Sequence, residues 1–443
     1  MKRLHLPLIA VLFAALGGGG MAGRAAAQTA AAPLTLAALE QLALAHNPTL
    51  RQARDNVAAA AGRTRQAGLW PNPTVGYEGA QIRGGSFRGG EQGAFVQQDI
   101  VLGGKLGAAR QEAAAAQRQQ QARAAGQGQA VGTAVQLAFY EALRAQQEVA
   151  LRQHLLAIAQ DAVRTTAQLA NVGQADQPDQ LEAQVEAGQA QLDLNQAQQM
   201  RTQDWAQLAA TVGQPSLQPQ PLAGDLATPP APILPQPYVQ RLLTESPAVR
   251  IAEAAVAQAQ AALRRARKQP IPDLQLRGGV EANRELDQLG QRPVGWQGFA
   301  SVGVQLPLFN RNQGNVEAAV AELDRAQQEL ERVRLSLRAQ AAPQLAAYQA
   351  ASLAVAQYRD HMLPQARQAY ALYLNNYHHM AAAYPQVLVA QRNWFQEQTG
   401  YLAAEAELWR SAVTLRGYLA TQGLDRMGAA PAALSMGTMG GGQ

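Results

Sequence analysis

Apolar and polar residues alternate strictly in two segments, 274–282 and 296–306, which predicts two β-strands that each have an apolar and a polar face. Residues 74–82 and 94–102 show a weaker form of the same alternation. Strands of about ten alternating residues are typical of outer-membrane β-barrels, where one face contacts lipid. The positions expected to face lipid are Leu274, Leu276, Val280, Val302 and Val304. A half-buried sheet in a soluble domain alternates too, so the strands alone leave both interpretations open.

The rest of the chain is rich in alanine and glutamine and has no wide apolar stripe, which favours long helices over a globular core. A helix over 104–170 would be about 100 Å long at ~1.5 Å per residue, and a second helix would run back beside it. Alanines at positions such as Ala108 and Ala115 would let neighbouring helices approach closely. We therefore expect a thin-walled helical tube with water on both sides.

An internal duplication organises the chain. Asn47-Pro48 matches Ser246-Pro247 at an offset of 199 residues, and Pro178 matches Pro385 at an offset of 207. The predicted domains are a first repeat over 28–222, a proline-rich linker over 223–237 and a second repeat over 238–425.

Each repeat has the same predicted order of elements, in which a helical hairpin follows a pair of strands. The expected elements are a first helix (36–69 and 237–268), two strands (within 73–102 and 272–308), a very long helix (104–170 and 313–376) and a returning helix (177–212 and 385–421). The hairpins thus cover about 104–212 and 313–421. The fold class that we expect is mainly α with a membrane β-barrel.

The first residues predict export. A positive start at Lys2 and Arg3 precedes an apolar stretch that ends at Leu16, and three alanines at 25–27 then offer small residues for cleavage. The apolar stretch is too short for a membrane anchor, which needs ~20 residues. We predict a cleaved signal peptide over 1–27.

Composition narrows the class of protein further. The chain has no cysteine, so it folds without disulfides and cannot be a lipoprotein. Without residues 1–27 the net charge falls from +5 to +2, because three basic residues and no acid are lost, so there is little reason to propose nucleic acid as a partner. No later segment has the length and apolarity of a transmembrane helix. Residues 426–443 are rich in Gly, Ala and Met and predict a disordered tail.

The number of strands requires more than one chain if the sheet lies in a membrane. Four strands cannot close a membrane barrel, since bacterial barrels begin at about eight strands, and open edges are not tolerated in lipid. Two chains would supply eight strands, whose interior is filled by side chains. Three chains would supply twelve, which leave a water-filled lumen.

A combination of motifs resembles the outer-membrane efflux protein (TolC) family over essentially all of residues 34–425. The motifs are Leu34-Thr35-Leu36, the run 67–73 (Ala-Gly-Leu-Trp-Pro-Asn-Pro), the run 99–105 (Asp-Ile-Val-Leu-Gly-Gly-Lys) and the run 306–314 (Leu-Pro-Leu-Phe-Asn-Arg-Asn-Gln-Gly). The last run and Pro71-Asn72-Pro73 look most like the branch that serves heavy-metal exporters (cobalt-zinc-cadmium or copper).

This resemblance implies a homotrimer. Twelve strands would form a pore in the outer membrane, and twelve helices would continue it as a tunnel across the periplasm. The hairpin tips would meet a periplasmic adaptor and, through it, an inner-membrane pump. The chain would be a passive exit duct with no enzyme activity and no cofactor.

The hairpin tips depart from the family pattern. Members often carry an aspartate pair after the second tip, where this chain has Gln386 and Val389, and Met380 takes the place of the usual tip glycine. The tip and aperture residues that we single out are Gly173, Asp176, Asp179, Leu181, Tyr377, Met380 and Gln386. Asp176 and Asp179 could form carboxylate rings at an aperture or could be ordinary residues of a helix N-terminus.

Other functional signals are weaker. His378 and His379 are the candidate metal ligands, but neighbouring residues on a helix point apart, so they would share a metal only across subunits, and a solvated turn is the plainer interpretation. The segment Leu102–Gly107 lacks the spacing of a phosphate-binding loop, and the Arg-Gly-Gly runs at 83–85 and 88–90 predict a surface loop. No catalytic constellation stands out. A periplasmic adaptor is the alternative, but it would need one hairpin and a compact β-domain.

Overall fold

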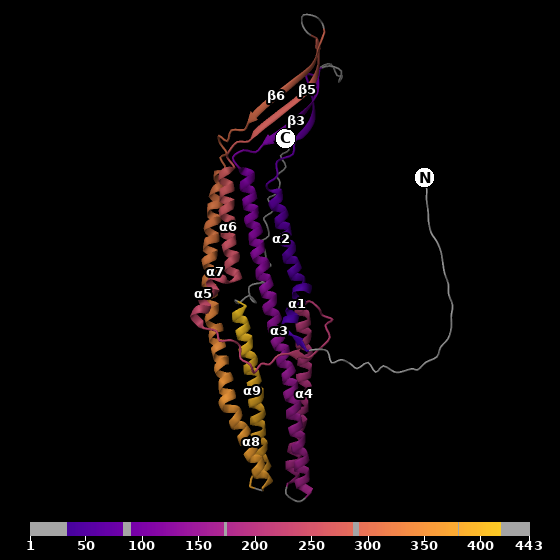
Figure 1. The fold of residues 1–443 in the computed structure, drawn as a ribbon, viewed down its shortest axis with the longest axis vertical. Helices are drawn as coiled ribbons and strands as arrows, with labels where there is room; N and C mark the ends of the chain where they lie inside the picture. Colours follow the sequence, from indigo (N-terminus) through magenta and orange to yellow (C-terminus); the bar gives the residue numbers. More distant parts are fainter. Residues whose placement is uncertain (1–32, 83–89, 172–174, 287–291, 380, 418–443) are drawn as a thin grey trace, which may run out of the picture.

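The computed structural model describes residues 33–82, 90–171, 175–286, 292–379 and 381–417. They form a long helical bundle that carries a small sheet at one end (Figure 1). The predicted signal peptide (1–27), the predicted tail (426–443), Gly173, Met380 and most of the glycine- and arginine-rich loop lie outside these ranges.

Among the described residues, the first repeat contains seven helices and strands, which follow the predicted order after a short strand at its start. The elements are β1 (Leu34–Thr35), α1 (Leu36–His46), α2 (Pro48–Gln66), β2 (Thr74–Ala80), β3 (Glu91–Ile100), α3 (Lys105–Asn171) and α4 (Gln177–Val212). α3 alone has 67 residues, as the sequence predicted, and α4 runs back along it.

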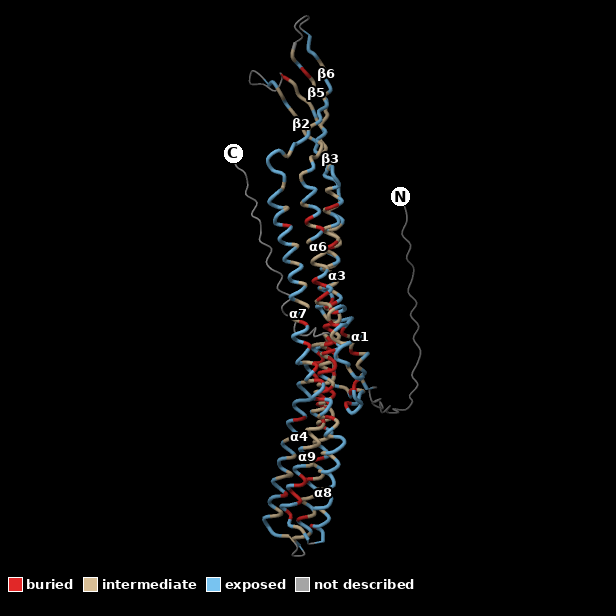
Figure 2. Tube along the Cα trace, turned by 90° about the vertical axis from the view of Figure 1, so that its left-hand side faces the viewer, coloured by how far each residue is buried: buried red, intermediate tan, exposed pale blue. Residues whose placement is uncertain are grey.

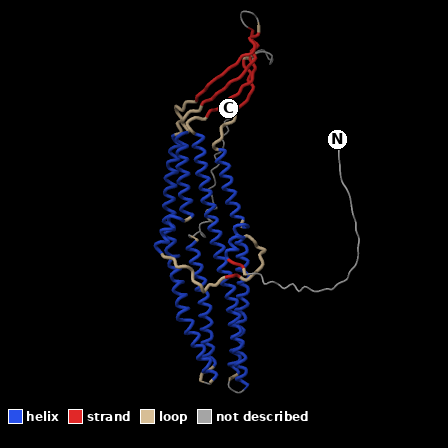
Figure 3. Tube along the Cα trace, in the orientation of Figure 1, coloured by secondary structure: helices blue, strands red, loops and turns tan. Residues whose placement is uncertain are grey.

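The second repeat follows the linker and has the same order. Its elements are α5 (Pro235–Glu245), α6 (Pro247–Lys268), β5 (Leu274–Leu286), β6 (Pro293–Val304), α7 (Gln313–Gln357), a turn of π-helix η1 (Tyr358–Met362), α8 (Leu363–His378) and α9 (Tyr384–Arg416). Figure 3 shows the long strands gathered beyond one end of the helices and short strand segments beside the helices at mid-height. The predicted tandem order of helices, strands and hairpins is confirmed.

Three predictions about the elements were wrong. The first helix of each repeat is split in two, because the Asn47 side chain accepts a hydrogen bond from the Thr49 amide (3.0 Å) and Pro48 opens a new helix. Ser246 caps α6 in the same way through the Val249 amide (3.2 Å). The very long helix of the second repeat is interrupted by η1.

The third error concerns the linker over 223–237. Its first part forms β4 (Leu222–Ala223), which pairs in parallel with β1. Gln146 of α3 holds this strand, since its side chain donates to the Leu222 carbonyl (3.2 Å) and accepts from the Leu222 amide (2.8 Å). Its last residues, from Pro235, already belong to α5. Two-residue strands carry no periodic signal, which explains why the sequence did not reveal them.

The core lies at mid-height, where α1, α3, α4 and the linker meet. Figure 2 shows buried residues gathered in that zone. The largest cluster includes Leu39, Val135, Leu143, Leu208 and Val212, each 0 % exposed. Toward the tips burial is sparse, in keeping with a thin helical wall. Within the described ranges, no helix is long and apolar enough to cross a bilayer.

Candidate functional site in the sheet and the hairpin tips

The four-stranded sheet combines both repeats in one antiparallel order, β2-β3-β5-β6. Residues that pair directly across strands point to the same face. Leu274 pairs with Val304 and Leu276 with Val302, and Val280 has the same parity along β5. All five predicted lipid-facing residues therefore share one face of the sheet.

This apolar face is exposed in the single chain. Val302 is 68 % exposed, Val280 56 % and Val304 49 %. The first repeat contributes Val75, Tyr77 and Val96 to the same face, and Trp296 is added near the loop end of β6. An exposed face of this size on four strands needs a partner. That the partner is lipid stays a prediction.

The opposite face is polar and contains a cluster that the sequence did not reveal. Arg277 of β5 forms an ion pair with Glu78 of β2, and its guanidinium lies 4.1 Å from the ring centroid of Phe95. Phe299 lies on its other side at 5.7 Å. The Phe95 ring covers Gly76, where an added Cβ would come within 2.5 Å of it. Two phenylalanines thus flank one arginine on a surface suited to water.

At the base of the sheet, Lys105 has a structural partner. Its ammonium contacts the Asp273 carboxylate at 2.7 Å, and the same carboxylate accepts from the Leu102 amide at 2.9 Å. The glycine-rich turn before Lys105 therefore connects β3 and α3 to the second repeat, which gives its lysine a role unrelated to phosphate binding.

The tips of the two hairpins are joined by tyrosines. Tyr377 of α8 and Tyr384 of α9 are buried against Ala183 of α4, with their ring centroids 5.6 Å apart. Neither hydroxyl has a hydrogen-bond partner among the described residues. Burial raises the pKa of Tyr384 to about 12, and burial together with the nearby charge of Asp179 raises the pKa of Tyr377. Asp179 therefore lies where the two hairpins meet.

The other predicted tip residues are open to solvent. Asp176 occupies the N-cap position of α4 but makes no side-chain capping bond, so the hydrogen-bonded form of the capping interpretation is wrong for it. Leu181 and Val389 are 53 % and 57 % exposed, and Gln386 is exposed as well. His378 and His379 are exposed at the end of α8. In the part of the chain that the structure describes, no group of three metal-ligating side chains occurs.

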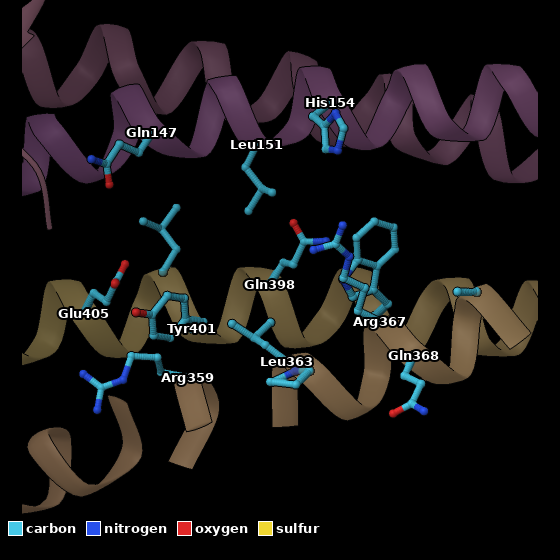
Figure 4. A pocket seen from close by; sticks show the side chains of 14 residues that line it. Gln147, Leu151, His154, Arg359, Leu363, Arg367, Gln368, Gln398, Tyr401 and Glu405 are labelled. Carbon is cyan, nitrogen blue, oxygen red and sulfur yellow. The ribbon is translucent and has the colours of Figure 1, made fainter. Parts of the chain in front are cut away.

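Above the tips, a groove of about 970 Å³ separates α3 from η1, α8 and α9 (Figure 4). Glu405 of α9 lines it and is only 5 % exposed. Burial raises the pKa of Glu405, which a hydrogen bond from the Tyr401 hydroxyl partly offsets. One oxygen of its carboxylate has no partner among the described residues. The groove arises from the packing of the helices, and no sequence motif predicted it.

A family model described as "Outer membrane efflux protein" matches residues 39–214 and 238–421. The chain belongs to the outer membrane efflux protein family. Each match covers one repeat, from its first helix to its returning helix, which agrees with the duplication seen in the sequence.

Two metal-resistance proteins are similar to this chain in sequence. The cobalt-zinc-cadmium resistance protein CzcC of Cupriavidus metallidurans is 29 % identical over 430 residues, covering 94 % of this chain and 99 % of CzcC. The nickel-cobalt-cadmium resistance protein NccC of Alcaligenes xylosoxydans xylosoxydans is 29 % identical over 328 residues, covering 70 % of this chain and 69 % of NccC.

The solved structure of CusC shares the fold of this chain. The crystal structure of CusC superimposes with a TM-score of 0.73 at 19 % identity and covers 87 % of this chain and 91 % of CusC. The predicted family is confirmed, and the alternative of a periplasmic adaptor is not supported. The family is one of efflux channels, a role without catalysis.

Proposed function

We propose that three copies of this chain form an outer-membrane exit duct, to which a periplasmic adaptor and an inner-membrane pump deliver metal cations. The observation that carries the proposal is the two-faced sheet. One face exposes valines, leucines and a tryptophan, whereas the other carries an ion pair and amide side chains. A closed sheet of this kind has a lipid-facing exterior and a water-filled interior.

The free edges of the sheet support a ring of copies. β2 and β6 are its outer strands, so neither is paired on its far side with another described residue of the chain. Because the two edges are different strands, joining β6 of one copy to β2 of the next gives a head-to-tail arrangement that closes into a ring. Three copies supply twelve strands, enough for a water-filled lumen.

The helices offer a matching pair of exposed stripes. On α4, Leu181, Val185, Leu192 and Met200 are all about half exposed or more, at spacings that place them on one side of the helix. On the second hairpin, Leu353 and Leu372 are 72 % and 56 % exposed. Packing one stripe against the other would continue the ring into the periplasm.

Mass measurement in detergent tests the assembly. The proposal expects a stable species of three chains that stays with membranes after a salt wash, extracts only in detergent and conducts ions in a planar bilayer. A stable monomer or dimer would contradict the proposed trimer.

The cargo is proposed from the relatives, which are named for resistance to cobalt, zinc, cadmium and nickel. Deleting the gene should lower tolerance of the host to these divalent cations, and the intact chain should restore it. An organic antimicrobial serves as the control compound. If the deletion lowered tolerance only to the organic antimicrobial, the proposal of an exit duct would stand, but the proposal that it exports metal cations would be contradicted.

Asp179 is proposed as an aperture residue because it lies beside Tyr377 and Tyr384 at the meeting point of the hairpins. Three copies would bring three carboxylates near a narrow aqueous mouth, where they attract cations. Single-channel recording on Asp179→Ala and Asp179→Asn should show altered conductance or cation selectivity with the trimer intact. Unchanged conductance with lowered stability would reduce Asp179 to a helix N-terminal residue. For His378 and His379 we favour a solvated turn.

A further inference from the structure

The junction between the helices and the sheet carries a dense group of cations. Four helix ends meet there: the last turns of α2 and α6 and the first turns of α3 and α7 (Figure 1). Six exposed cations of this junction, which we call the basic collar, are Arg63, Arg65, Arg110, Arg264, Arg267 and Lys268.

Several contacts show that the members of the collar lie in one zone. The Arg110 side chain of α3 lies 3.2 Å from the point where a Cβ on Gly68, just after α2, would stand. The Lys268 ammonium of α6 lies 3.2 Å from the corresponding point on Gly104, just before α3. Asn312, at the start of α7, donates to the Ala266 carbonyl of α6 at 2.8 Å.

Two acids of this zone are already engaged by other cations. Asp273 pairs with Lys105 at 2.7 Å, and Glu112 pairs with Arg265 at 3.0 Å. Within the described ranges, no member of the collar has a carboxylate within 4.0 Å. The charge of the collar is therefore open to a partner from outside the chain.

The helix dipole explains only part of the collar. Cations in the last turn of a helix are favourable, which accounts for Arg63, Arg65, Arg267 and Lys268. Arg110 lies in the second turn of α3, close to a helix N-terminus, where a positive charge gains nothing from the dipole.

An exposed apolar band borders the collar on the side of the sheet. Phe309 is 92 % exposed, Leu306 65 % and Trp70 57 %, and Leu102 and Ile271 are exposed as well. These residues enter or leave the strands, so they mark the level at which the apolar face of the sheet ends. Aromatic and apolar side chains followed by cations are the order found where a protein passes from hydrocarbon to lipid headgroups.

We propose that the basic collar binds anionic phospholipid headgroups of the membrane leaflet that faces the helices. This inference rests on the proposed function, which puts the apolar face of the sheet in that membrane. Guanidinium groups bind phosphate oxygens through paired hydrogen bonds, and an exposed cation near an anionic surface is attracted within a Debye length. The collar would fix the depth of the duct and make its lipid binding dependent on salt.

The test uses the full-length protein in nanodiscs that contain phosphatidylcholine and phosphatidylglycerol in equal parts. After release in the mass spectrometer, the number of retained lipids of each kind is counted. The collar variant combines Arg65→Gln, Arg264→Gln, Arg267→Gln and Lys268→Gln. The matched control removes four exposed arginines nearer the middle of the bundle, by Arg51→Gln, Arg54→Gln, Arg250→Gln and Arg338→Gln.

We expect the wild type and the control to retain several-fold more phosphatidylglycerol than phosphatidylcholine. The collar variant should retain the two lipids about equally, and raising the salt concentration should bring the wild type toward the same ratio. An unchanged preference in the collar variant, or an equal loss in the control, would overturn the inference. Failure of the proposed function is separable, because it would show in the wild type itself as a chain that neither trimerises nor conducts.

Discussion

The two repeats contain the same order of elements, yet their hairpins are built differently. The outgoing helix of the first hairpin, α3, is one helix of 67 residues. In the second hairpin the same path is divided into α7 (45 residues), η1 (5 residues) and α8 (16 residues), with Pro343 inside α7. The two repeats therefore share one architecture, but the outgoing helix is continuous in the first and interrupted in the second.

Pro364, the second residue of α8, directly follows the break, whereas Pro343 lies within α7. In a regular helix the Pro364 ring would meet the carbonyl of the residue four positions earlier, and Pro364 has no amide to donate. In η1 the Leu363 amide instead donates to the Tyr358 carbonyl, five positions earlier. The wider turn removes the clash without ending the helix.

The glycines of the two returning helices have different surroundings. Gly400 of α9 faces the joint, where an added Cβ would stand 2.7 Å from the Tyr358 hydroxyl oxygen. Gly188, in α4 of the first hairpin, has open space around the same point. A methyl group at Gly400 would therefore require the end of the Tyr358 side chain to move, whereas one at Gly188 would meet no neighbour within 4 Å.

The largest expected effect is the loss of stability when a charge is placed on the apolar face of the sheet. Strands from both repeats contribute to that face, so we expect the same loss in each. Val96→Arg in β3 and Val302→Arg in β6 should each cost about 2–4 kcal/mol near the bilayer midplane, because both residues lie on the apolar face. Folding into lipid vesicles under urea titration gives the free energies. Gln275→Arg, on the polar face, is the control and should be mild. A cost at Val302 without one at Val96 would show that only the second repeat faces lipid.

Replacing a glycine in each returning helix should change the stability in opposite directions in the two repeats. Gly400→Ala should cost about 1–3 kcal/mol, because the new methyl group crowds Tyr358. Gly188→Ala should instead stabilise the helix by about 0.5–1 kcal/mol. Thermal unfolding of both variants measures the difference. Combining Gly400→Ala with Tyr358→Ala should recover part of the loss, and an additive double variant would contradict the proposed contact.

The smallest expected effect depends on pH. Burial raises the pKa of Glu405 above its value in the unfolded chain, so the folded state holds the proton more tightly. Stability is therefore greatest below the unfolded pKa and falls as the pH rises through the folded pKa. Glu405→Gln should abolish this fall and melt higher than the wild type at about pH 8, with little difference at about pH 4.

The first repeat supplies the control for this effect. At the offset of 207 residues, its counterpart of Glu405 is Gln198, which is exposed. Gln198→Glu should leave the pH dependence of melting unchanged, because an exposed carboxylate loses no hydration. Parallel pH profiles of Glu405→Gln and the wild type would contradict the role assigned to burial.

The features that the sequence predicted are those with a period. Alternation over 274–282 was enough to put Leu274, Leu276 and Val280 on one face, since strand parity does not depend on which strands are neighbours. The 67-residue length of α3 also followed from uninterrupted helical composition. The Asn47-Pro48 break carried a readable capping signal that a continuous-helix interpretation overlooked.

The features that escaped prediction depend on contacts between distant segments. Glu78 and Arg277 are 199 residues apart, and the adjacency of β3 and β5 brings their strands into one sheet. The groove at Glu405 needs three helices from two hairpins, and the collar needs four helix ends at one level. No local sequence pattern predicts these contacts, because each residue taken alone resembles an ordinary surface residue.

The position of η1 along the second hairpin has a geometric consequence. α8 extends 16 residues beyond it, about 24 Å at ~1.5 Å per residue. A bend of about 10° there displaces the tip by about 4 Å, whereas the unbroken α3, about 100 Å long, needs a tilt of only about 2° from its sheet end for the same displacement. A bend at η1 would move only α8. A tilt of α3 would move that helix along its whole length relative to the helices packed against it.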